Sequence, residues 1–293
     1  MLDRVLKVSL AGLPAWIVCI ALLTVSGPAR AQGGENATAR CTNGAMGAAA
    51  IACANYQRAV NGIPRITEDV RKDASSWCPD EDDDKKGVAD WRDMSRAVSG
   101  WGKSSSPWDN APLHQEDIYN PLLNQAGEAN MDGEACWGAL PTISEYRITM
   151  VRYYTFINER GNSQVPTSEI TNETPFTPQQ LVGLGGKTTG PTIIAYATGF
   201  KAEILEASGA MTATAWTLKS AGKNIPDVKM VDDAIAAKHG YPGYVDGDSV
   251  FIIPAHPLHP GGYIGTITWK SPRGQTGTQH YRFKVPSLGD HRS

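Results

Sequence analysis

Short runs of β-forming residues, separated by turns rich in Gly and Pro, recur through the second half of the chain. Regularly spaced short strands with such turns are typical of a sandwich of two antiparallel sheets. We therefore expect a small β-sandwich domain at residues 192–286. Its predicted strands are Thr192–Tyr196, Met211–Leu218, Ser249–Ile253, Tyr263–Trp269 and Tyr281–Val285.

The first half carries helical patterns instead. A helix is predicted over residues 48–60, where apolar side chains share one face, and Gly62-Ile63-Pro64 is expected to end it. A second helix is predicted from Thr67 to Trp77. A third is predicted from a stripe whose members are spaced three, four and three residues apart. The members of that stripe are Trp91, Met94, Val98 and Trp101.

The two halves meet in a segment of mixed character. A strand is expected at residues 147–157, which are rich in aromatic and aliphatic side chains. Residues 158–191 are rich in Gly, Pro, Thr, Asn and Gln, which indicates a linker or an extended segment. The fold class predicted from these patterns is α+β, with two domains.

The charge balance excludes one class of partner. The 293 residues carry a formal net charge of −3, and the pI is near 6.1. A nucleic-acid-binding domain normally has a basic surface and a pI above about 9. The hydrophobic content of 41% is that of an ordinary globular protein, not of a disordered chain. We expect no nucleic-acid partner.

Residues 1–31 have the pattern of an export signal. Arg4 and Lys7 precede an apolar run at residues 8–25, and Ala29-Arg30-Ala31 offers the small residues at which signal peptidase cleaves. An uncleaved anchor is the alternative, because the run approaches the roughly 20 residues that span a bilayer. Cleavage changes the formal charge from −3 to −5 and leaves no stable membrane span. The mature chain is expected to be secreted, extracellular or periplasmic.

Four cysteines remain after cleavage, and an even number in an exported protein predicts two disulfides. They are Cys41, Cys53, Cys78 and Cys136. Three connectivities are possible. If the first two predicted helices form a hairpin, Cys53 lies close to Cys78, which leaves Cys41 to pair with Cys136. A zinc site is disfavoured because no pair has the short Cys-x-x-Cys spacing.

Residues 55–66 contain a spaced pattern of polar and turn residues. Asn55, Arg58, Gly62 and Pro64 stand in the order N-x-x-R-x-x-x-G-x-P. This pattern resembles the opening helix of bacterial exported members of the CAP superfamily, which includes the cysteine-rich secretory, antigen 5 and pathogenesis-related proteins (SCP-like extracellular domains). The resemblance implies a CAP-like α-β-α sandwich at residues 41–157.

A second block extends the resemblance. Trp108, His114 and Gly127 have the spacings found in bacterial members, and Cys136-Trp137-Gly138-Ala139-Leu140 would form the strand that follows. Residues 173–178 and the final strands also look like those of exported proteins that pair a CAP-like domain with a β domain. The resemblance therefore covers residues 45–157 in two blocks and extends weakly beyond them.

The chain departs from the family at the cleft. Many CAP domains place two His and two acidic residues there and bind a divalent metal, and His114 matches one of those histidines. Where the second His is expected, this chain has Cys78-Pro79-Asp80. A single His holds zinc poorly, because zinc sites use three or more protein ligands. We expect no metal and no cofactor.

Two interpretations of His114 stay open: a structural residue at a helix start or cleft wall, or a residue for metal binding or acid–base chemistry beside Glu116 and Asp117. His256 and His259 stand in a Pro-rich segment without an obvious third ligand nearby, which favours an extended loop over a metal site.

The leading functional hypothesis is a secreted, non-catalytic CAP-like protein that binds an unknown ligand or partner in the cell envelope or outside the cell. The incomplete cleft favours this over the alternative, a metal-assisted hydrolase that acts on peptide or cell-wall material through His114. A further alternative is an adhesin that uses the β domain for recognition.

Overall fold

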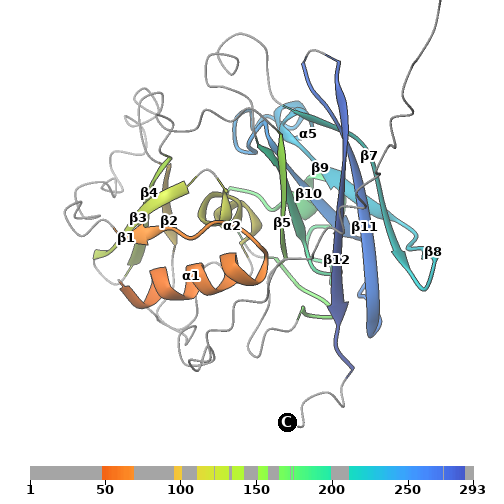
Figure 1. Cartoon of the computed structure of the whole chain (residues 1–293), viewed down its shortest axis with the longest axis horizontal. Coiled ribbons are helices and arrows are strands. Elements are labelled where there is room, and N and C mark those ends of the chain that lie inside the picture. The colour runs from red at the N-terminus through yellow and green to blue at the C-terminus, as the bar shows by residue number, and fades with distance from the viewer. Residues whose placement is uncertain are drawn as a thin grey trace, which may run out of the picture. The chain divides into compact units, whose positions relative to one another are not determined.

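The computed structural model combines short helices with three four-stranded sheets, which makes the protein a mixed α+β fold (Figure 1). No helix among the described residues is long and apolar enough to span a membrane. The structure describes residues 48–68, 96–100, 111–121, 123–131, 134–141, 151–157, 165–171, 173, 175–198, 211–272 and 274–287.

Helix α1 spans Ala48–Val60, which confirms the helix predicted there. It ends in a Schellman motif. The backbone N–H of Ile63 donates to the carbonyl of Arg58 at 2.7 Å, and that of Gly62 donates to the carbonyl of Ala59 at 3.1 Å. Gly62 has a φ of +70°, a conformation that glycine adopts at little cost, so its place in the sequence pattern is explained by the helix end.

The two further helices predicted in the first half were wrong where the structure describes them. Thr67–Glu68 is strand β1, which pairs in parallel with β3 (Leu123–Met131). Arg96–Gly100 is strand β2, which pairs with β4 (Glu134–Pro141) and places Val98 opposite Trp137. Pairing with a neighbouring strand decides the structure here. The spacing of the apolar residues indicates that they are buried, but it does not show which part of the chain packs against them. The other members of both predicted stripes lie outside the described residues.

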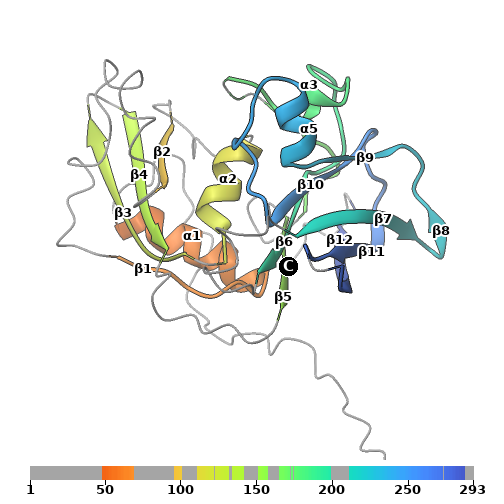
Figure 2. The same ribbon diagram turned by 90° about the horizontal axis from the view of Figure 1, so that it is seen from above.

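The second sheet has the order β5-β6-β10-β9 and is antiparallel throughout. Its central strands are buried on both faces. In β6, Ile194 and Tyr196 join one core with residues of α1 and α2, whereas Ile193 and Ala195 join a second core with the third sheet. The strands are β5 (Arg152–Ile157), β6 (Ile193–Thr198), β9 (Val228–Val231) and β10 (Ser249–Pro254), and α2 spans Pro112–Tyr119. Figure 2 shows α2 between this sheet and the sheet of β1–β4.

The third sheet has the order β12-β11-β7-β8. Its inner face packs on the second sheet around Trp269, which is fully buried. The Trp269 indole N–H donates to Gln279 Oε1 at 2.8 Å, and the Gln279 amide donates to the Tyr154 carbonyl at 2.7 Å, so a buried amide links the two sheets. The strands are β7 (Thr212–Ser220), β8 (Lys223–Asn224), β11 (Gly261–Lys270) and β12 (Thr276–Val285).

The five strands predicted after residue 192 are confirmed, with shifts of a few residues at their ends. Four short elements of the second half were not predicted. Strands β8 (Lys223–Asn224) and β9 and the helices α3 (Pro178–Leu181) and α5 (Asp233–Lys238) have too few residues to show a periodic pattern. Strand β5 falls in the predicted first domain, yet its ladder partner is β6 of the predicted second domain. Residues 31–293 form one compact unit.

Candidate functional site

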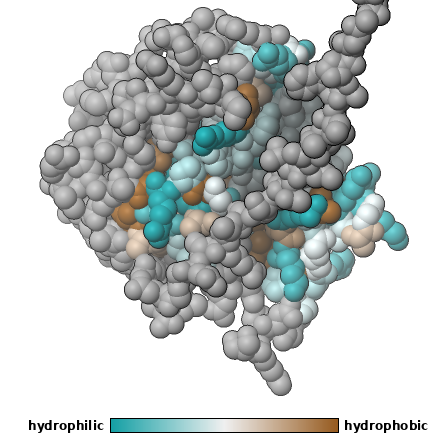
Figure 3. Space-filling view, viewed as in Figure 1, coloured by the Kyte–Doolittle hydropathy of each residue, from teal (hydrophilic) through white to brown (hydrophobic). Residues whose placement is uncertain are grey.

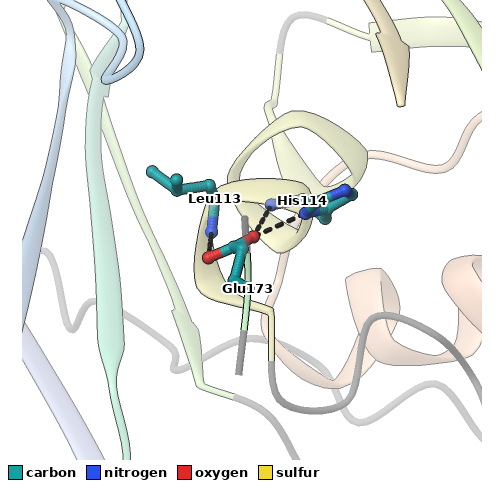
Figure 4. Close-up of polar contacts among 3 residues, drawn as sticks. All are labelled: Leu113, His114 and Glu173. Carbon is teal, nitrogen blue, oxygen red and sulfur yellow. Dashed lines mark hydrogen bonds and ion pairs between the residues drawn. The ribbon is translucent and has the colours of Figure 1, made fainter. Parts of the chain in front are cut away.

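The candidate site lies at the start of α2, where His114 meets Glu173. The two residues are 59 positions apart in the chain, and His114 Nδ1 lies 2.5 Å from Glu173 Oε1 (Figure 4). The carboxylate is fully buried, while the imidazole side chain is 21% exposed. His114, the site residue predicted from sequence, therefore has an acidic partner that the sequence analysis did not assign to it.

Glu173 also caps the helix. Its Oε2 accepts the backbone N–H of Leu113 at 3.0 Å, and its Oε1 accepts that of His114 at 2.9 Å. The N-cap residue Ala111 has no side chain that could do this, and Pro112 at the first position has no N–H to satisfy. One carboxylate from a distant segment thus satisfies the first turn of α2 and fixes the orientation of the His114 ring.

The segment that carries Glu173 is itself anchored. Phe176 is buried in the first core and lies against Tyr241, with ring centroids 4.1 Å apart. Thr177 begins α3 in a capping box with Gln180, in which each side chain accepts the other residue's backbone N–H. These contacts hold the chain on the carboxyl side of Glu173 in place, so the carboxylate is presented to α2 by a fixed backbone.

Burial raises the pKa of Glu173 above its usual value of 4.5, and the hydrogen bond and charge of His114 oppose that rise. In the folded chain the carboxyl group therefore binds its proton more tightly than in the unfolded chain. The stability that this difference contributes is fully present below pH 4.5 and is lost as the pH rises through the folded pKa.

The variant Glu173→Gln cannot titrate at this position. We therefore expect the free energy of unfolding of the natural chain, measured relative to that of Glu173→Gln, to fall as the pH is raised from about 4 to about 8. Chemical denaturation across that range measures the difference. Asp227→Asn is the matched control, because Asp227 is exposed and the Lys229 ammonium holds its pKa below the usual 3.8, so its contribution should stay constant over the same range. A Glu173 difference that stays constant or grows with pH contradicts the expectation.

The opposite end of α2 is held by a buried cation. Arg58, on α1, is fully buried, and its Nη1 donates to the carbonyls of Ile118 at 2.9 Å and Asn120 at 3.0 Å. Its Nη2 donates to the Leu123 carbonyl at 3.1 Å and its Nε to the Pro64 carbonyl at 2.6 Å. A cation at the C-terminus of a helix and an anion at its N-terminus both interact favourably with the helix dipole. Arg58 and Glu173 therefore supply a compensating charge at each end of α2.

The sequence pattern that includes Arg58 thus has a structural explanation. The Asn55 side chain donates to the carbonyl of Ile66 at 2.6 Å and accepts its backbone N–H at 2.7 Å. Pro64 supplies one of the carbonyls that Arg58 binds, and Gly62 makes the turn. These four residues position α1 against the chain that follows it and do not themselves form a reactive site.

A second buried polar group joins α2 to the loop before β10. Glu116 accepts the backbone N–H of Asp246 at 2.8 Å and also accepts the Ser249 hydroxyl. Asn120 donates to the Asp246 carboxylate at 2.9 Å, and the Tyr196 hydroxyl donates to the Glu116 carbonyl at 2.9 Å. Burial and the Glu116 charge raise the pKa of Tyr196 well above its usual value. Glu116, which lies two residues after His114 in the sequence, therefore holds α2 in position.

Three other residues of the sequence prediction lie on elements away from the start of α2. Gly127 lies on β3 opposite Gly138, Cys136 lies on β4, and Cys53 lies on α1. Trp108, Cys41 and Cys78 lie outside the described residues, so the pairing Cys53–Cys78 with Cys41–Cys136 stays a prediction.

His256 and His259 lie far along the chain in the exposed turn after β10. His256 Nε2 lies 3.9 Å from the Asp227 carboxylate, which is already paired with Lys229 Nζ at 2.6 Å. The His259 carbonyl accepts the Tyr263 hydroxyl at 2.7 Å. Within the described part of the chain, no three His, Cys, Asp or Glu side chains come together as a metal site would require.

Comparison with protein-family models gave no match, and a search of curated proteins found no similar sequence. The arrangement around α2 is therefore interpreted from its own geometry. That geometry is an imidazole at the surface, oriented by a buried carboxylate, on a helix fixed at both ends.

Proposed function

We propose that the chain is an exported CAP-like protein that binds a ligand or partner in the cell envelope through the face of α2 that presents His114. The pattern at residues 1–31, the even number of cysteines after it and the two sequence blocks support export and the CAP-like arrangement of the first half. On this proposal, the first domain has the CAP α-β-α arrangement and the second half is a small β-sandwich.

The contact between His114 and Glu173 carries the proposal. A binding site needs polar groups held in one geometry by the surrounding structure, because ordering a mobile side chain on binding costs free energy. Glu173 orders the imidazole in advance, and the buried contacts of Arg58 and Glu116 hold the helix beneath it. The partly exposed ring is therefore ready to donate or accept a hydrogen bond.

The test is cosedimentation of the purified mature chain with peptidoglycan sacculi, with release of soluble fragments measured in the same samples. We expect His114→Ala to lower the bound fraction several-fold, since it removes the oriented polar group. His239→Ala is the matched control, because His239 is exposed at the end of α5 and should leave binding unchanged. Equal binding by the natural chain and His114→Ala contradicts the proposal.

A second candidate is a hydrolase that acts on peptide or cell-wall material through His114. The observation that favours it is the same contact, because an ionised Glu173 keeps the proton on Nδ1 and leaves the lone pair of a neutral imidazole on Nε2, as a general base requires. Soluble fragments released by the natural chain but not by His114→Ala would establish this candidate and exclude the non-catalytic one. The adhesin alternative places recognition on the β domain at residues 192–286.

A further inference from the structure

The outer face of the β12-β11-β7-β8 sheet is basic although the chain as a whole is acidic. Neither residues 211–226 nor residues 261–287 contain Asp or Glu, whereas the whole sequence has 30 acidic and 27 basic residues. Four exposed cations face outward from these strands, as the strand register shows. They are Lys219, Lys270, Arg282 and Lys284.

The register places three of these cations close together. Directly opposite residues of an antiparallel pair project to the same face. Ile264 on β11, which is 47% exposed, stands opposite Lys219 on β7 and Arg282 on β12. Lys284 stands opposite Gly262, two positions further along the same face. In the described part of the chain, Lys219 and Arg282 have no carboxylate partner.

Hydroxyl groups continue the same face. Thr266 on β11 stands opposite Thr217 on β7 and His280 on β12, and its hydroxyl lies 3.3 Å from His280 Nδ1. Thr268 stands opposite Thr278 in the following row. The aromatic residues of β7, β11 and β12 project instead to the inner face. In Figure 3, the visible part of this side of the molecule carries teal, hydrophilic residues mixed with paler and brown ones.

We propose that this basic face, defined by Lys219, Thr217, Thr266, Arg282 and Lys284, binds an anionic polysaccharide. Exposed cations concentrated on one face attract an anionic partner even when the net charge is negative. Threonine hydroxyls both donate and accept hydrogen bonds, as recognition of sugar hydroxyls requires. An exposed sheet face accommodates an extended chain.

The chemistry of the face disfavours two other anionic partners. Single-stranded nucleic acid is bound through aromatic side chains on which bases stack, and the outer face of the described strands presents no Phe, Tyr or Trp. An interfacial membrane contact buries a continuous apolar surface, and Ile264 is the one large aliphatic side chain among the cations of this face. This inference depends on the proposed envelope function in one respect: that function makes a polysaccharide the natural ligand of this face.

The test measures binding of the full mature chain to dextran sulfate and polygalacturonate, with neutral dextran, anionic phospholipid vesicles and single-stranded DNA as comparisons. We expect the triple variant Lys219→Gln/Arg282→Gln/Lys284→Gln to lose roughly tenfold in affinity for both anionic polysaccharides. The matched control is Arg65→Gln/Lys223→Gln/Lys238→Gln, which removes one exposed Arg and two exposed Lys outside this face and should change affinity less than twofold.

Equal losses in the two triple variants, or no binding of the natural chain to either anionic polysaccharide at low salt, overturn the proposal. Tighter binding to the vesicles or to DNA than to the polysaccharides overturns the choice of occupant. Neither variant touches the α2 site, so loss of sacculus binding in His114→Ala with retention of polysaccharide binding separates the two proposals.

Discussion

Replacing Arg58 with Met is expected to lower the free energy of unfolding by about 3–5 kcal/mol, the range seen when one partner of a buried charged network is removed. Met fills much of the volume but donates no hydrogen bond. The carbonyls of Pro64, Ile118, Asn120 and Leu123 would then lose the guanidinium that satisfies them inside the protein. The C-terminus of α2 would also lose its compensating charge.

Urea denaturation of the purified mature chain measures this effect. Arg65→Met is the matched control: Arg65 is exposed seven residues along the same segment, and its replacement should change stability by no more than about 0.5 kcal/mol. If Arg58→Met does not fold, Arg58→Lys keeps the charge with fewer donors and should lose about 1–3 kcal/mol. A loss from either Arg58 variant no larger than that of Arg65→Met would contradict the role assigned to this side chain.

Gly265→Ala is expected to destabilise the protein by about 3 kcal/mol or more, at the upper end of the cost of overpacking a core. Gly265 on β11 stands directly opposite Tyr281 on β12, and the tyrosine ring covers it. A methyl group added at Gly265 would lie 1.9 Å from Cζ of that ring. The ring cannot move away cheaply, because Tyr281 is buried between the second and third sheets.

Gly262→Ala provides the control on the same strand. A methyl group at Gly262 would meet nothing within 4 Å, and the backbone there does not have a positive φ. Alanine restricts the unfolded chain more than glycine does, so this change should be neutral or stabilise by up to about 1 kcal/mol. Thermal denaturation of both variants should therefore give effects of opposite sign or widely different size. Similar losses for both would mean that the Tyr281 ring does not determine the cost.

The sequence was a good guide wherever local chemistry decides the structure. Helix α1 and its end at Gly62 follow from residues within one short segment, and the strands after residue 192 follow from runs bounded by turns. Val98 shows where that approach fails. Its spacing from other apolar residues fits a helix, but a strand partner at Trp137, remote in sequence, makes it part of a sheet.

For the same reason, one of the two residues of the candidate site could be predicted and the other could not. His114 was predicted because its spacing from Trp108 and Gly127 resembles that of bacterial CAP-superfamily members, and this spacing is local information. Glu173 lies in residues 158–191, whose composition indicates a linker or an extended segment, and only the fold brings it to α2. One signal was present: α2 begins with Pro112 after an alanine that cannot cap, so its first N–H groups need an acceptor from water or from elsewhere in the chain.

The two charges that hold α2 come from opposite directions along the chain, Arg58 from before the helix and Glu173 from after it. During synthesis the N-terminal part emerges first, so a nascent chain that has reached Tyr119 already contains the cation but not the anion. The first turn of the helix and the orientation of His114 are completed only when Glu173 and the strands beyond it have been made. A chain truncated before Glu173 therefore carries the histidine without the group that orders it, which makes an ordered His114 a marker that synthesis and folding have proceeded into the second half.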